Sequence, residues 1–106
     1  MNTVYSTLEP ERSAIDKLGE PALLEFGSPW CGYCRAAQPL IAAAMARHAG
    51  LTHIKVADGS GRPLGRSFRV KLWPTLIFLK NGVEVSRLVR PTSSAEIAEA
   101  LAAIQS

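Results

Sequence analysis

This 106-residue sequence has only two cysteines and two histidines, no internal repeat, no low-complexity linker and no long apolar run. Two cysteines are too few for a framework of structural disulfides, and cysteines outside such a framework suit an intracellular setting. No apolar stretch approaches the ~20 residues that a membrane-spanning helix needs. The first residues, from Met1 to Tyr5, show neither the basic nor the apolar segment of an export signal. We therefore expect one cytoplasmic domain over residues 1–106, and a periplasmic location stays open if an export signal has been removed.

The charge of the chain is mildly basic, with a formal net charge of +3 and a pI near 9.2. A nucleic-acid-binding protein would show clustered basic residues within a recognisable module. The nearest cluster consists of Arg62, Arg66, Arg69 and Lys71, and it is more consistent with a bias in the choice of protein partner. We expect a monomer that binds neither nucleic acid nor a membrane.

The two cysteines stand close together in Trp30-Cys31-Gly32-Tyr33-Cys34. This spacing is typical of a redox dithiol, of half a metal site or of a haem attachment site. Haem attachment needs a histidine after the second cysteine, where this chain has Arg35. A zinc site needs about four ligands, and only His48 and His53 are available besides the cysteines, without paired spacing. The residues therefore favour a redox dithiol that needs no cofactor and no metal.

The residues around the cysteines predict where the dithiol lies in the fold. The apolar run 22–26 predicts a buried strand, residues 27–29 break it, and the alanine-rich stretch 35–48 predicts a helix. The dithiol then lies at a helix N-terminus, where free N–H groups and the helix dipole favour a negative charge. Because the thiolate is the nucleophile, we expect Cys31 to be exposed and to attack. We expect Cys34, one turn into the helix, to be shielded and to resolve the mixed disulfide.

The rest of the chain alternates between helix and strand signals. Strands that alternate with helices predict parallel pairing in the first part of an α/β fold, and Asn81-Gly82 predicts an antiparallel hairpin. The further predicted elements are an edge strand at 3–6, helices at 9–18 and 31–49, a strand at 51–56, a short helix at 63–68, strands at 75–79 and 83–89, and a C-terminal helix opened by a capping box at 93–96.

Four features stand in order along the chain and match one family. They are Trp30-Cys31-Gly32-Tyr33-Cys34 followed by Pro39, the Trp73-Pro74-Thr75 segment, the Lys80-Asn81-Gly82 turn, and the pair Glu25 and Lys55 on two strands. On these features the chain resembles the thioredoxin family over nearly its whole length. The resemblance implies the thioredoxin fold, in which helices flank a central mixed sheet with a parallel part and an antiparallel hairpin.

The resemblance also implies a function and a catalytic set. Cys31 and Cys34 would reduce protein disulfides through a dithiol–disulfide cycle, Glu25 would accept the proton of Cys34, and Lys55 would be the partner of Glu25. We expect burial to raise the pKa of Glu25 towards neutrality, which suits a proton acceptor. The alternative is that Glu25 serves only as the structural ion-pair partner of Lys55.

The family's substrate site would lie beside the dithiol. By resemblance Pro74 is in the cis form, faces the dithiol and leaves the backbone of Trp73 free to pair with an extended segment of a disulfide-containing protein. A thioredoxin reductase or another dithiol donor would be the second partner. The expected substrate-binding residues are Trp30, Gly32, Tyr33, Trp73, Pro74 and Thr75.

Three departures from the family pattern indicate a narrower role. Tyr33 replaces the proline of the reducing thioredoxins and makes the dithiol more similar to that of periplasmic disulfide isomerases. Trp73 is bulkier than the residue that usually precedes the cis-proline in the family. Arg90-Pro91 stands near the position where thioredoxins have a glycine that lets a partner approach closely. The alternatives are a protein-disulfide oxidant or isomerase, a binding or assembly module without turnover, and a dimer that shares one zinc between two Cys-x-x-Cys pairs.

Overall fold

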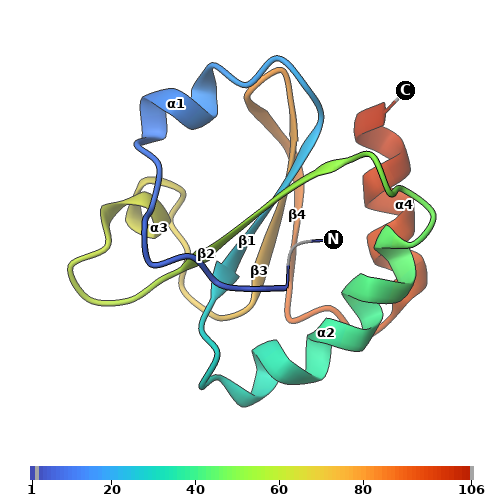
Figure 1. Ribbon diagram of the computed structural model, residues 1–106, viewed down its shortest axis with the longest axis horizontal. Helices are drawn as coiled ribbons and strands as arrows, with labels where there is room; N and C mark the ends of the chain where they lie inside the picture. Colours follow the sequence, from blue (N-terminus) through green and yellow to red (C-terminus); the bar gives the residue numbers. More distant parts are fainter. Residues whose placement is uncertain (2, 106) are drawn as a thin grey trace.

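The computed structural model describes residues 1 and 3–105, and a four-stranded sheet in the order β2-β1-β3-β4 forms its centre. Helices α2 and α4 cover one face of this sheet, and α1 and α3 lie on the other (Figure 1). No helix among the described residues is both long and apolar enough to cross a membrane. The elements are α1 (Arg12–Asp16), β1 (Ala22–Gly27), α2 (Gly32–Met45), β2 (Thr52–Ala57), α3 (Pro63–Ser67), β3 (Thr75–Lys80), β4 (Val83–Val89) and α4 (Ser94–Gln105).

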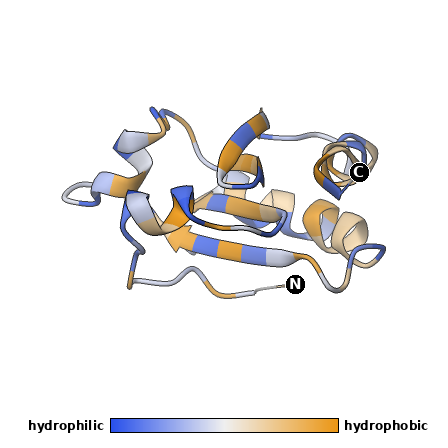
Figure 2. Ribbon diagram, turned by 90° about the horizontal axis from the view of Figure 1, so that it is seen from above, coloured by the Kyte–Doolittle hydropathy of each residue, from blue (hydrophilic) through white to orange (hydrophobic). Residues whose placement is uncertain are grey.

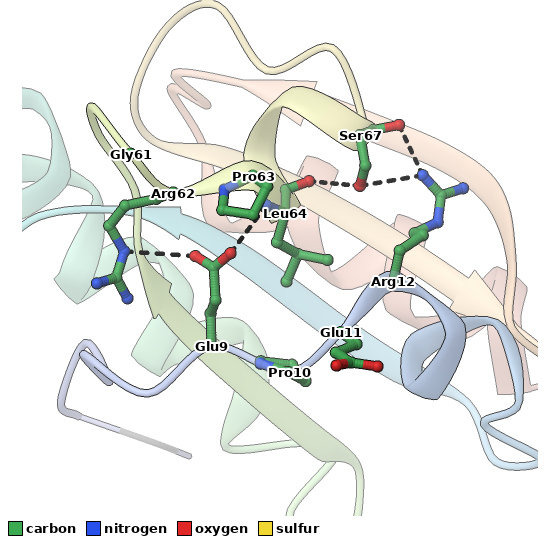
Figure 3. A pocket seen from close by; sticks show the side chains of 9 residues that line it. All are labelled: Glu9, Pro10, Glu11, Arg12, Gly61, Arg62, Pro63, Leu64 and Ser67. Carbon is green, nitrogen blue, oxygen red and sulfur yellow. Dashed lines mark hydrogen bonds and ion pairs between the residues drawn. The ribbon is translucent and has the colours of Figure 1, made fainter.

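The N-terminal segment has less regular secondary structure than the sequence predicts. The strand expected at 3–6 is a single bridge between Ser6 and Val56, and α1 is shorter than the predicted helix at 9–18. The cause lies in α3. Glu9 Oε1 accepts a hydrogen bond from the Leu64 N–H over 3.0 Å, at the first turn of α3, and Glu9 also pairs with Arg62 over 3.3 Å (Figure 3). Glu9 therefore caps another helix instead of starting its own.

The two faces of the sheet carry two separate apolar clusters. Leu23 and Phe78 pack under α2 and α4, whereas Leu24 and Ile77 pack under α1 and α3, because successive residues of a strand point to opposite faces. Hydrophilic and hydrophobic residues also alternate along β2 (Figure 2). The strand β1 is buried along its whole length, so its one charged residue must be satisfied inside the protein.

The direction of β3 determines where the loops meet. β1 pairs with β2 in parallel, as predicted, but β3 runs antiparallel to β1 although a helix precedes it. Phe26 near the end of β1 lies opposite Thr75 at the start of β3. The segment before β3 therefore lies at the same end of the sheet as the segment after β1. β4 returns along β3 with Val89 opposite Thr75, which brings Arg90 to the same end of the sheet.

The two turn signals in the C-terminal half are confirmed. Asn81 and Gly82 connect β3 to β4 with φ angles of 53° and 76°, as a two-residue hairpin requires. Ser93 Oγ accepts a hydrogen bond from the Glu96 N–H over 3.2 Å at the start of α4. These local signals are borne out because each is satisfied by residues within one turn of chain.

Candidate active site

The dithiol lies at the N-terminus of α2, as the sequence predicts. Cys31 is the N-cap residue, and its Sγ accepts a hydrogen bond from the Cys34 N–H over 3.1 Å. Both cysteines are free thiols; Cys31 is partly exposed, whereas Cys34 is 0% exposed. A partner can therefore reach Cys31 but not Cys34. The Cys31 sulfur thus lies at the positive end of the α2 dipole, with a backbone N–H pointing at it.

Cys34 lies in a less favourable environment for ionisation. Burial raises the pKa of its thiol to about 11, and the hydrogen bond with Cys31 adds to the shift, while contacts with Ser28 and Tyr5 oppose it. The Cys34 thiol therefore holds its proton at neutral pH. Any reaction that uses Cys34 as a nucleophile needs a group that takes this proton away.

The segment before β3 faces the dithiol. The Trp73–Pro74 peptide bond is cis, as the resemblance implies, and Cys31 Sγ lies 3.9 Å from the carbonyl oxygen of Trp73. The Trp73 indole donates a hydrogen bond to Asp58 over 2.9 Å. The Thr75 side chain is buried, and its hydroxyl donates to the Leu72 carbonyl over 2.6 Å. Thr75 therefore braces this loop, and its side chain does not reach a partner in this conformation.

Arg90 occupies part of the expected docking edge. Its Nε donates a hydrogen bond to the Trp73 carbonyl over 2.9 Å, and its guanidinium lies 3.8 Å from the centre of the Tyr33 ring. The Arg90 N–H also donates to the Pro74 carbonyl over 3.0 Å. The prediction that the Trp73 backbone is free to pair is therefore wrong for its carbonyl group. A partner strand must displace Arg90 or use the second lone pair of that oxygen.

An exposed apolar rim surrounds the partly exposed thiol. Trp30 is 87% exposed and Tyr33 is 60% exposed, on either side of Cys31 in the sequence, and Gly32 between them is exposed as well. Leu72, next to the cis-proline loop, is 48% exposed. Exposed aromatic side chains are enriched where proteins bind other proteins. The rim is suited to contact an apolar polypeptide segment.

A buried polar network lies below Cys34, on the α2 face of the sheet. Glu25 Oε2 accepts hydrogen bonds from the Tyr5 hydroxyl over 2.6 Å and from Gln38 over 3.1 Å. Glu25 Oε1 lies 2.9 Å from His53 Nε2, and Lys55 Nζ lies 3.8 Å from Glu25 Oε2. Lys55 also donates to the Gln38 side-chain oxygen. The carboxylate and the ammonium are therefore both satisfied inside the protein.

The network reverses one prediction about Glu25. Burial does push the pKa of this carboxyl upward, but the hydrogen bonds from His53, Tyr5 and Gln38 and the charge of Lys55 together outweigh burial. The pKa of Glu25 is thus lowered, not raised towards neutrality as expected. Glu25 is ionised at neutral pH and can accept a proton, but only as a weak base.

Comparison with known proteins identifies the family. A family model described as Thioredoxin matches residues 4–103. The chain belongs to the thioredoxin family. The structure of thioredoxin 2 from Pseudomonas aeruginosa PAO1 in its reduced form is 51% identical, covers 98% of this chain and 96% of that chain, and gives a TM-score of 0.87.

Two curated relatives share only part of their length with this thioredoxin-family chain. Thioredoxin-1 of Caenorhabditis elegans is 36% identical over 66 residues, which make up 62% of this chain and 57% of the relative. The TPR repeat-containing thioredoxin TDX of Arabidopsis thaliana is 30% identical over 89 residues, which make up 82% of this chain and 23% of the relative. The predicted family and fold are confirmed, and membership together with the two neighbouring cysteines supports thiol–disulfide oxidoreductase chemistry.

Three residues of this thioredoxin-family site were not predicted from the sequence. His53 lies beside Glu25. The sequence could have indicated this position, because His53 and Lys55 are two residues apart on β2 and therefore point to the same face of the sheet. Gln38 lies one helical turn after Cys34 and donates to the Cys34 carbonyl over 2.8 Å, which a helix spacing of four could have indicated. Tyr5 gives no such signal, because only tertiary structure brings it to Glu25.

Two further features of the described residues bear on ligand binding. Within residues 1 and 3–105, no three His, Cys, Asp or Glu side chains gather as a metal site would require. A surface hollow of about 480 Å³ lies between the N-terminal segment and α3 (Figure 3), and none of the residues that line it belongs to the dithiol site.

Replacing Glu25 by glutamine should test the energetics of this network. Glutamine keeps the shape but removes the charge, so Lys55 stays buried without a carboxylate. We expect the free energy of unfolding at neutral pH to fall by about 3 kcal/mol, measured by urea denaturation. Glu84→Gln is the control, because Glu84 and Arg87 are paired but about 30% exposed, and its loss should stay below about 1 kcal/mol.

The same pair of proteins has an expected pH dependence. Because the pKa of Glu25 is lower in the folded than in the unfolded chain, its contribution is complete above the unfolded value of about 4.3. That contribution is lost as the pH falls through the lower, folded value. The unaltered protein should therefore lose stability on acidification more steeply than Glu25→Gln. Parallel curves would show that Glu25 is not stabilised as an anion.

Proposed function

We propose that the protein reduces disulfide bonds of other proteins, with Cys31 as the nucleophile and Cys34 as the resolving thiol. The observation that carries this function is a partly exposed thiol at a helix N-terminus, next to a fully buried thiol and facing a cis-proline loop. One sulfur is thus available to a partner, and the second is available only to the first. This asymmetry suits a two-step exchange.

The two steps balance as follows in electrons and protons. The Cys31 thiolate attacks one sulfur of the substrate disulfide, that S–S bond breaks, and the released sulfur leaves as a thiolate that takes up a proton. The Cys34 thiolate then attacks Cys31 Sγ, the mixed disulfide breaks, and the second substrate sulfur leaves in the same way. The substrate gains two electrons and two protons, and a Cys31–Cys34 disulfide remains for a dithiol donor to reduce.

Docking would combine the apolar rim with the cis-proline loop. Trp30, Gly32 and Tyr33 present exposed surface beside Cys31, and an extended segment would pair with the backbone of Trp73 before the cis-proline once Arg90 is displaced. Arg90 covers the Trp73 carbonyl and restricts this edge. The arrangement supports disulfide-containing proteins as substrates and favours a narrower set of partners than an open edge would.

Glu25 would be the final proton acceptor for Cys34, with Lys55 holding the carboxylate in place. Glu25→Gln should therefore slow turnover at neutral pH, in addition to its effect on stability. An unchanged pH–rate profile in that variant would remove Glu25 from the mechanism and leave it a structural partner of Lys55.

We further propose a cytoplasmic monomer that a thioredoxin reductase or a similar dithiol donor recycles. A working dithiol with no other cysteine fits a reducing compartment. The runner-up is a protein-disulfide oxidant or isomerase, which the Tyr33 side chain between the cysteines favours because these residues tune the reduction potential.

Insulin reduction with a thioredoxin reductase, together with the reduction potential, tests this function. A reductant should precipitate insulin chains catalytically and show a potential near about −270 mV. A potential between about −180 and −120 mV would instead assign the protein to the oxidants and isomerases. No exchange with any disulfide in either direction would reject the redox function and favour the binding module.

A further inference from the structure

The Tyr5 hydroxyl lies between the buried thiol and the buried carboxylate. It donates a hydrogen bond to Glu25 Oε2 over 2.6 Å, and it also lies near the Cys34 thiol, because the hydroxyl oxygen and Cys34 Sγ lie 2.6 and 2.7 Å from the same point beside Gly27. The hydrogen bonds that the structure records for Glu25 come from Tyr5, Gln38 and His53. The hydroxyl thus connects the two groups that the proposed function needs to exchange a proton.

The position of Tyr5 is fixed by its neighbour in the chain. The Ser6 N–H donates to the Lys55 carbonyl over 2.8 Å, and the Ser6 carbonyl accepts from the Ala57 N–H over 2.9 Å. These two bonds attach the N-terminal segment to the outer edge of β2. The Tyr5 ring then lies against Lys55, whose Nζ is 4.3 Å from the ring centre. Backbone pairing and a cation–π contact therefore hold the ring in place.

Gly27 leaves the space in which the hydroxyl and the thiol meet. A Cβ atom at this position would lie 2.6 Å from the Tyr5 hydroxyl oxygen and 2.7 Å from Cys34 Sγ. Real side chains do not make such short contacts, so any residue larger than glycine would push the two groups apart. The end of β1 is therefore shaped to allow the contact.

We propose that Tyr5 is a proton relay that carries the proton of Cys34 to Glu25 during resolution of the mixed disulfide. The Cys34 S–H gives its proton to the Tyr5 oxygen while the Tyr5 O–H gives its own proton to Glu25 Oε2. Tyr5 ends as a neutral phenol, Glu25 as a carboxylic acid and Cys34 as the thiolate that attacks Cys31 Sγ. This role rests on the dithiol cycle proposed above and adds a residue to it.

The chemistry of the neighbours supports a relay in which Tyr5 never ionises. Burial and the nearby Glu25 raise the pKa of the Tyr5 hydroxyl far above its usual value, so both transfers must occur together. After the transfer the Tyr5 O–H carries the former Cys34 proton and can donate it in a hydrogen bond that stabilises the new thiolate. Gln38 also contacts both Tyr5 and Glu25, but an amide does not carry protons at neutral pH. The titratable groups around the relay are Glu25, Cys34, Cys31 and Lys55, with His53 beyond Glu25.

Single-turnover reduction of an aromatic nitrobenzoate disulfide separates the steps, because each step releases one coloured thiolate. The first release reports attack by Cys31, and the second reports resolution by Cys34. In Tyr5→Phe, which keeps the ring over Lys55, the first release should be unchanged. The second should slow about tenfold or more, within the range that general acid–base catalysis supplies. Raising the pH should restore it, since hydroxide can then ionise Cys34 directly.

Mixtures of light and heavy water give a second readout that needs no variant. Two protons in flight predict a curved dependence of the second rate on deuterium content in the unaltered protein, and a linear or absent one in Tyr5→Phe. Gly27→Ala keeps the tyrosine but separates it from Cys34, so it should also slow only the second release. Gly19→Ala is its control, because a Cβ there meets nothing within 4 Å.

Each outcome decides between the two proposals. The relay is overturned if the rate of the second release in Tyr5→Phe equals that of the unaltered protein. It is also overturned if that rate depends linearly on deuterium content in the unaltered protein. Either result leaves the dithiol cycle standing. The double variant Tyr5→Phe/Glu25→Gln should be no slower than the slower single variant, because both residues serve one path; additive losses would also overturn the relay. Absence of the first release in the unaltered protein would reject the dithiol cycle itself.

Discussion

Replacing Cys31 by serine is expected to reduce disulfide exchange by about 10³-fold or more, the scale seen when an enzyme loses its nucleophile. A serine hydroxyl stays protonated where a thiol ionises, and the buried Cys34 cannot substitute for Cys31 because a partner does not reach it. Cys34→Ser should behave differently. In this variant the partly exposed Cys31 thiol still attacks, but the reaction stops at the mixed disulfide.

The two cysteine variants serve as controls for each other. Serine and cysteine side chains are nearly equal in volume, so thermal unfolding should confirm that each variant folds. Mass spectrometry without reductant, after mixing with a disulfide peptide, should show the covalent adduct in Cys34→Ser and none in Cys31→Ser. If Cys31→Ser kept full activity, the redox function would fail and a binding or assembly role would gain support. If Cys34→Ser released product at the normal rate, Cys34 would not be the resolving thiol.

Gly82→Ala is expected to cause a large loss of stability. Gly82 has a φ of 76° in the β3–β4 turn, and a Cβ there would overlap the backbone carbonyl of Asp16 at the end of α1. A backbone atom cannot rotate away as a side chain can, so the turn or α1 has to shift. Backbone strain and overpacking together should lower the free energy of unfolding by about 3 kcal/mol.

Thermal unfolding measures this effect directly. A loss of that size corresponds to a fall in Tm of more than about 12 °C for a domain of this length. Gly50→Ala is the matched control, because a Cβ at Gly50 meets nothing within 4 Å, and its Tm should change by only a few degrees. Equal Tm values for Gly82→Ala and Gly50→Ala would show that the turn does not pack against α1 in solution.

Local sequence signals determined the elements of this protein and the location of its dithiol. The cysteine pair, the apolar run before it and the alanine-rich stretch after it are neighbours in sequence, so their strand–turn–helix arrangement follows from backbone preferences alone. Asn81-Gly82 and the capping box of α4 were also predictable, since each is completed by residues a few positions away. Helix ends were less predictable: α1 is shortened because Glu9 caps α3 instead.

Only the tertiary structure decided what surrounds the two sulfurs. The antiparallel direction of β3 brings Pro74 and Arg90 to the end of the sheet where β1 ends. A parallel β3 would have placed the cis-proline loop at the opposite end of the sheet. Glu25 is a weak base rather than a strong one because His53, Tyr5, Gln38 and Lys55 converge on it from three separate segments. Such convergence sums contacts between residues far apart in the chain, and no pattern along the chain records that sum.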